Sequence, residues 1–171
     1  MTMTLIASTT LGSSADAITF SDIPQNGTDL IAICSLRERD TNNFTLAIKL
    51  NGSLLNFSSR LLQGSGSAAV SATTSSPTNL TIPANPSNST SNTFGNGQIY
   101  IPNYTGSANK SISIDGVQEY NQAEAYQRIT AALRSDTAAI TSLEIAGGLA
   151  AGCTVSLYKI TKGTDGIVVV S

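Results

Sequence analysis

The 171-residue chain offers few side chains for catalysis, because it contains no histidine. Histidine supplies the base for most serine and cysteine nucleophiles and many zinc ligands, so those arrangements are removed. A pair of carboxylates could still catalyse glycoside hydrolysis. The candidates are Asp115, Glu119 and Glu124, but solvated surface charges explain them more simply. We therefore predict no enzyme, no bound cofactor and no metal site.

The two cysteines, Cys34 and Cys153, each lie within an apolar stretch. Two cysteines alone do not make a zinc site. Activation of a thiol needs a basic neighbour, and only Arg37 lies close to Cys34 in the sequence. Buried free thiols are the favoured interpretation, and a disulfide between neighbouring strands stays open.

The tyrosines raise the possibility of sugar stacking. Tyr100 and Tyr104 are four residues apart, so on an unbroken strand they share one face. Ile99 and Ile101 have the opposite parity and are expected to serve the core. Both rings are therefore predicted to face away from the core, as candidates for a subunit interface before sugar binding.

Composition limits the partners. Only 12% of the residues are charged, the net charge is −2, and no basic cluster occurs. Nucleic-acid binding needs concentrated Lys and Arg, and no apolar stretch is long enough to span a membrane. The start of the chain also lacks the pattern of a secretory signal. A neutral surface of Ser, Thr, Asn and Gly is typical of an exposed assembly component or a glycan binder.

Alternation of apolar and polar residues predicts an all-β, jelly-roll-like antiparallel β-sandwich, a single domain spanning residues 1–171. At the start of 28–39, both odd-numbered and even-numbered positions are apolar, which indicates a central strand covered on both faces. Within 126–135, Ile129 and Leu133 alternate with polar residues, which favours a strand over a helix. The expected strands are 3–8, 16–23, 28–39, 42–52, 56–66, 98–104, 110–120, 126–135, 139–148 and 152–163.

Two segments interrupt this pattern. Residues 64–97 hold most of the prolines and long Ser/Thr/Asn runs, which predicts a long surface excursion with one short strand at "NLTIP". Residues 121–127 are expected to form a short helical turn. A C-terminal extension strand is predicted at 164–171. Its β-branched edge is expected to pair with a neighbouring subunit, through Ile167, Val168, Val169 and Val170.

Four stretches resemble a group of tailed-bacteriophage virion proteins that are common in phages of marine bacteria. They are "DAITFSDIPQNGTDLIAICSLR", "NFSSRLLQGSGS", "FGNGQIYIPNYTGSANKSISIDGVQEYNQAEAYQ" and "GGLAAGCTVSLYKI". The similarity runs from about Ala17 to Ile160. It implies a jelly-roll-like sandwich on the exterior of a virion, as head decoration or as a tail-fibre or appendage module. The extension "KGTDGIVVVS" departs from the group, and no fibre-shaft repeat is expected in this single domain.

These observations favour a capsid decoration (cement) protein on the phage head. The resemblance implies the major capsid protein as partner, and we expect a homo-oligomer, a trimer, with no nucleic acid or membrane bound. Met1 to Thr10 and the 167–170 segment are the expected subunit or capsid contacts. The alternative is a tail-fibre or appendage module that binds host glycan through the 64–97 excursion, Asn103 and the two tyrosines.

Overall fold

The computed structural model describes residues 1–40, 44–74, 80–119, 121 and 125–162. These residues form strands and no helix. The first six strands are β1 (Thr2–Thr10), β2 (Ala15–Phe20), β3 (Asp29–Leu36), β4 (Thr45–Leu50), β5 (Phe57–Gly64) and β6 (Ala69–Thr74). The next six are β7 (Leu80–Pro83), β8 (Gly95–Ile101), β9 (Lys110–Gln118), β10 (Tyr126–Arg134), β11 (Leu143–Leu149) and β12 (Thr154–Thr161).

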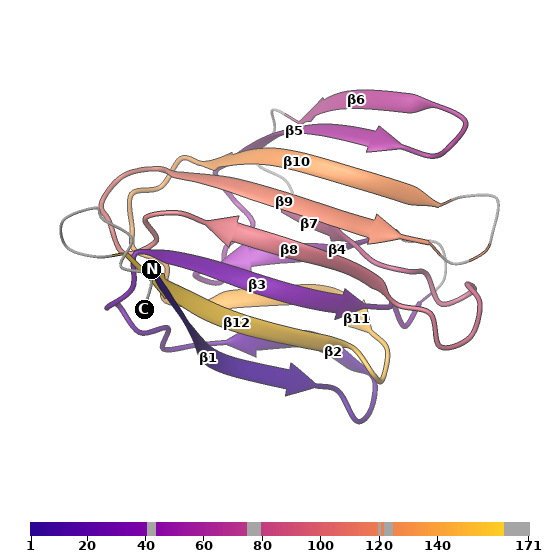
Figure 1. Ribbon diagram of the computed structural model, residues 1–171, viewed down its shortest axis with the longest axis horizontal. Coiled ribbons are helices and arrows are strands. Elements are labelled where there is room, and N and C mark those ends of the chain that lie inside the picture. The colour runs from indigo at the N-terminus through magenta and orange to yellow at the C-terminus, as the bar shows by residue number, and fades with distance from the viewer. Residues whose placement is uncertain (41–43, 75–79, 120, 122–124, 163–171) are drawn as a thin grey trace.

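The strands form two antiparallel sheets that pack as a sandwich (Figure 1). One sheet has the order β1-β12-β3-β8-β9-β10-β5-β6, and the other has the order β2-β11-β4-β7. Four pairs define the fold: β1 with β12, β2 with β11, β3 with β8, and β4 with β7. These pairs follow one another along a single antiparallel ribbon, and successive pairs lie alternately in the larger and the smaller sheet. This arrangement is the jelly-roll topology. The predicted fold class is therefore confirmed.

Two hairpins are inserted into this ribbon. The β5–β6 hairpin lies between β4 and β7, and β9–β10 lies between β8 and β11 in the chain. Both join the larger sheet beyond β8. As a result, β10, β5 and β6 extend past the smaller sheet, as Figure 1 shows. We call these three strands the overhang.

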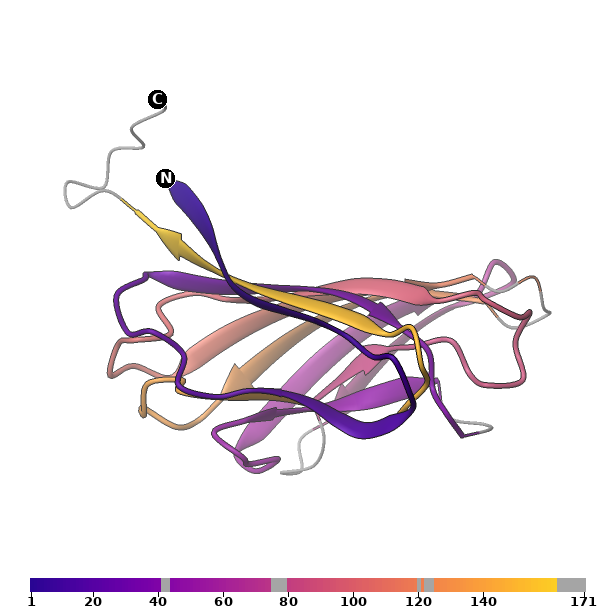
Figure 2. The same cartoon turned by 90° about the horizontal axis from the view of Figure 1, so that it is seen from below.

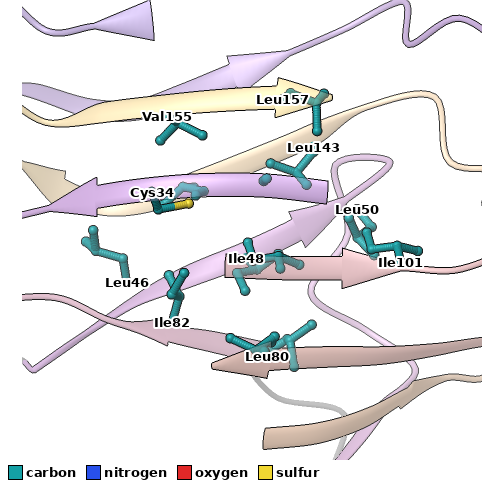
Figure 3. Close-up of a cluster of buried hydrophobic side chains, with 14 of the residues drawn as sticks. Cys34, Leu46, Ile48, Leu50, Leu80, Ile82, Ile101, Leu143, Val155 and Leu157 are labelled. Carbon is teal, nitrogen blue, oxygen red and sulfur yellow. The ribbon is translucent and has the colours of Figure 1, made fainter. Parts of the chain in front are cut away.

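The core lies between the two sheets and is built from the inward-facing residue of each alternating pair (Figure 3). In β4, Leu46, Ile48 and Leu50 are fully buried, and Cys34 of β3 packs in the same cluster. Full burial of each Leu or Ile contributes about 1.5–3 kcal/mol. The alternation in β4 thus explains its place in the centre of the smaller sheet.

The prediction that β3 is covered on both faces is wrong within this single chain. Leu30, Ala32 and Cys34 face the core, but Ile33 is 42% exposed. The smaller sheet covers only one face of the larger one, so the second apolar face of β3 meets solvent.

In the described parts of the 64–97 segment, 64–74 and 80–97, the chain contains more strands than the one predicted. β6 pairs with β5, and β7 is an edge strand of the smaller sheet. Leu80 and Ile82 are buried in the core, which confirms the short strand predicted at "NLTIP". The β6 strand has the composition AVSATT, whose small residues carry no clear apolar pattern, so sequence reasoning missed it.

A glycine pair allows the two sheets to approach closely. Gly97 of β8 lies directly opposite Gly116 of β9. A Cβ atom on Gly97 would lie 2.7 Å from the Asp115 carbonyl oxygen and 3.0 Å from Cδ1 of Ile82. Both distances are too short for a side chain, so backbone or core would have to shift.

We expect Gly97→Ala to lower the free energy of unfolding by about 1–3 kcal/mol, because it overpacks this contact. Urea unfolding followed by circular dichroism measures the change. Gly64→Ala is the matched control, since a Cβ atom on that strand glycine would have no other atom within 4 Å and should change stability by less than about 0.5 kcal/mol. Equal losses in both variants would contradict the overpacking argument.

Candidate assembly surface

Tyr100 lies on the outer face of the larger sheet, the face directed away from the smaller sheet. Its hydroxyl donates to the carboxylate of Asp29 at 2.7 Å. The backbone N–H of Asn103 donates to the other oxygen of this carboxylate at 3.0 Å, and Nζ of Lys162 lies 2.6 Å from the oxygen that Tyr100 contacts. Asp29 is only 2% exposed. The cluster fixes the Tyr100 ring on the sheet, and its predicted role in an interface stays a prediction.

The pKa of Asp29 is lowered from its ordinary value. Burial by itself would raise the pKa, but hydrogen bonds from Lys162, Tyr100 and Asn103 together stabilise the charged form more strongly. In return, the bond to Asp29 raises the pKa of Tyr100. The carboxylate is therefore held ionised beneath the Lys162 side chain.

Tyr104 does not face away from the core, so that prediction is wrong. β8 ends at Ile101, and Asn103 adopts a positive φ of 50°, so the chain reverses before Tyr104 and strand parity no longer applies. Its ring is fully buried. The hydroxyl donates to the carbonyl of Pro24 and accepts from the N–H of Gly27. A fully buried ring offers no surface to a subunit or a sugar.

The carboxylates singled out for glycosidase chemistry are not brought together. Asp115 lies on β9, and Glu119 follows the end of that strand, where its Oε1 accepts from the N–H of Asn121 at 2.8 Å. Four residues of extended chain span about 13 Å, which is wider than the roughly 5–9.5 Å between glycosidase carboxyl groups. Glu124 lies outside the described residues.

Both cysteines are free and buried, as the sequence favoured. Burial raises the pKa of Cys34 to about 12. Burial also raises the pKa of Cys153, whose thiol donates to the carbonyl of Arg37 at 3.1 Å and accepts from its N–H at 3.2 Å. Neither thiol is poised as a nucleophile.

Of the two predicted contact segments, the structure describes the first. β1 is one of the two edge strands of the larger sheet, and among the described strands it pairs with β12 alone. Met3 and Leu5 are 49% and 51% exposed, and Thr2–Thr10 contains no charged residue. Figure 2 shows the start of β1 and the end of β12 rising together from the body of the sandwich. Residues 167–170 lie outside the described residues. Of the helical turn expected at 121–127, residues 122–124 also lie outside them, and Tyr126 and Gln127 belong to β10, so that prediction is wrong at its end.

Sequence reasoning missed a pair of buried cations. Lys110 and Arg134 lie opposite each other on β9 and β10 and are 1% and 2% exposed. Nζ of Lys110 donates to the carbonyls of Gly106 and Ala108, and Arg134 pairs with Asp136 at 2.7 Å. Burial and the charge of Arg134 lower the pKa of Lys110. The alternation at 126–134 predicts the strand correctly, but its polar side faces inward.

Arg37 organises the loop between β7 and β8. Its guanidinium donates to four backbone carbonyls, those of Thr90 at 2.8 Å, Thr93 at 3.0 Å, Ser87 at 2.8 Å and Ser89 at 3.0 Å. One planar cation thus holds a polar loop in a single shape. No local pattern in the sequence signals this contact, because Arg37 and the loop are far apart along the chain.

No protein-family model, curated protein or solved structure matches this chain. Among the described residues, no group of three or more His, Cys, Asp or Glu side chains could hold a metal ion. The same residues contain no helix that could span a membrane. The resemblance to phage virion proteins therefore stays a prediction that rests on the sequence.

We expect the chain to lose stability as the pH falls below 3.8, the ordinary pKa of Asp29. Because the folded-state pKa is lowered, the unfolded chain binds the proton more readily, so the stabilisation is present above 3.8 and is lost as the pH falls through the folded value. Asp29→Asn should flatten this dependence, and Tyr100→Phe should flatten it partly. Urea unfolding at a series of acidic pH values measures both. An unchanged slope in Asp29→Asn would exclude a contribution from this cluster.

Proposed function

We propose that this protein is a structural component of a tailed-bacteriophage virion, a decoration protein on the outside of the capsid. It assembles as a homotrimer, and each trimer bridges neighbouring copies of the major capsid protein. The exposed, uncharged edge strand β1 is the observation that carries the proposal. The resemblance of the sequence to phage virion proteins supplies the setting.

An open edge strand presents a row of unpaired backbone N–H and C=O groups. Monomeric proteins commonly protect such an edge with charges, a proline or a bulge. β1 has a bulge between Leu5 and Ala7 but no charge and no proline. Apolar side chains at Met3 and Leu5 flank the open edge. These features support pairing with another subunit or with the capsid surface.

The proposed mechanism is mechanical. Each contact with the capsid is modest in area, but a trimer makes several contacts at once. Multivalent attachment raises the overall affinity because later contacts form at a high effective concentration. The bridged capsomers then resist the outward pressure of the packaged DNA.

We expect Met3→Lys combined with Leu5→Lys to convert a trimer into a monomer. Lysine ammonium groups are strongly hydrated, and their placement along an edge opposes pairing with a second chain. Sedimentation equilibrium measures the mass. Leu55→Lys is the matched control, because Leu55 is 57% exposed but lies in the loop between β4 and β5. A wild-type monomer, or a double variant that stays trimeric, would count against β1 as the contact.

The position of the protein on the particle tests the virion assignment directly. Cryo-electron microscopy of the phage should show added density on the head lattice, and heads that lack the protein should open at lower osmotic shock. Density on the tail alone would instead support a fibre or appendage module.

The ordered loop held by Arg37 favours a second candidate function, binding of a host cell-surface glycan. Its exposed tip carries the amide and hydroxyl groups of Asn88, Ser91 and Asn92, and a preorganised polar loop loses less entropy on binding. A glycan array on the purified chain tests this. Consistent signals that Arg37→Met abolishes would support it. An array without signal, or signals that this variant retains, would remove it.

A further inference from the structure

The overhang carries an apolar patch on the outer face of the larger sheet. Leu62 of β5 lies directly opposite Ile129 of β10, and the two side chains are 56% and 53% exposed. Leu133 of β10 is 39% exposed on the same face. The ribbon of the larger sheet continues past that of the smaller sheet (Figure 1). In β10, Thr130, Ala132 and Arg134 are buried, whereas Ile129 and Leu133 are exposed on the outer face.

Two neighbouring hollows lie on this face. The first, of about 310 Å³, is lined by Arg60, the hydroxyl-bearing Ser58 and Ser111, and Leu133. The second, of about 210 Å³, is almost wholly apolar and is lined by residues that include Leu62, Ala69 and Ile129. The two linings share no residue, but both include residues of β5 and β10 in successive positions along these strands. We call the two hollows together the groove.

Arg60 gives the first hollow its charge. Among the described residues its hydrogen-bond partner is the carbonyl of Ser59, at 3.1 Å, whereas a guanidinium has five N–H donors. The residues paired with Arg60 on the two neighbouring strands, Thr73 and Ala131, are neutral. Arg60 is the charged residue of the overhang strands on this face, because Arg128 and Arg134 of β10 have the opposite parity and bond to Gln63 and Asp136.

The charge pattern differs in the next row of residues that lie opposite one another across the strands. In that row, Leu62 of β5 lies opposite Ile129 of β10, which lies opposite Asp115 of β9. A carboxylate on a ligand is therefore attracted to the Arg60 row and repelled from the Leu62 row, where an apolar group is favoured. The two rows are two residues apart on β5, which is about 7 Å.

We propose that this groove binds an extended protein segment that carries an Asp or Glu two residues from a large apolar side chain. Alternate side chains of an extended segment lie on one face about 7 Å apart, so the carboxylate reaches Arg60 and the apolar side chain enters the hollow at Leu62 and Ile129. That the partner is the capsid surface rests on the proposed function. The proposal that the groove binds such a segment does not depend on it.

Other occupants fit less well. Neither hollow is lined by an aromatic ring on which a sugar could stack. A stable dimer buries about 800 Å² on each partner, which a few exposed aliphatic side chains cannot supply. A modest contact that is repeated in each subunit of a multivalent protein does not need so large a buried area.

The experiment is a titration of the full-length chain, with isotope-labelled methyl groups, by short synthetic peptides. One peptide is acetyl-Thr-Thr-Glu-Thr-Leu-Thr-Thr-amide, and the second has Lys in place of Glu. We expect the methyl signals of Leu62, Ile129 and Leu133 to shift, with about threefold tighter binding of the Glu peptide, as for an exposed ion pair. Arg60→Glu should reverse this preference.

Leu62→Asp should abolish the shifts, while Leu55→Asp, at a similarly exposed leucine, should leave them unchanged. Backbone amide spectra confirm that each variant is folded. Equal responses to both peptides, an unchanged preference in Arg60→Glu, or shifts confined to β1 would overturn the proposal. So would shifts of the same methyl groups on raising the protein concentration alone, which identify a second copy, or on adding glucuronic acid in place of peptide.

Binding to phage heads separates this proposal from the proposed function. If wild-type protein binds heads and Arg60→Glu binds them equally well, the capsid contact lies elsewhere and the groove has no role in it. If wild-type protein does not bind heads but the Glu peptide still shifts the three methyl groups, the decoration function fails and the groove stands.

Discussion

The difference in size between the two sheets determines much of the structure. A jelly roll supplies four strands to each sheet, but both inserted hairpins join the same one. An apolar face is stable only where something covers it. The four strands of the smaller sheet cover the ribbon part of the larger sheet, and the overhang extends past them (Figure 1). Exposed Leu62 and Ile129 lie on the outer face of this overhang, which no second sheet covers.

Charged groups are also found inside the sandwich. Lys110 and Arg134 are buried on the neighbouring strands β9 and β10. Backbone carbonyls accept from Lys110, and Asp136 accepts from one Nη of Arg134, whereas Nε and the other Nη of Arg134 have no hydrogen-bond partner among the described residues. A buried cation without such acceptors would cost several kcal/mol. Asp29 is a comparable case on the outer face, where Tyr100 and Lys162 close over the carboxylate. Polar clusters thus seal the sandwich where apolar packing ends.

Much of the fold could be predicted from the sequence because strand alternation is a local signal. The segments of β4 and β9 show it clearly, and both are strands. The orientation of a strand relative to its neighbours is not local, so the pattern of β10 could not reveal which face is buried. The prediction for Tyr104 fails for a related reason, since a turn at Asn103 resets the parity on which it depends. Arg37 and its loop meet only through the tertiary fold.

The two ends of the larger sheet share one property that bears on assembly. Both edge strands, β1 and β6, are uncharged, and each adjoins exposed aliphatic residues on the outer face, Met3 and Leu5 at one end and Leu62 at the other. Charged edges prevent unwanted pairing, so their absence at both ends removes that barrier. Between the ends, the outer face carries polar residues such as Gln98 and Ser113. Exposed Ile33 of β3 also lies on this face between the two ends, so the two ends are distinguished by their uncharged open edges and not by apolar residues alone.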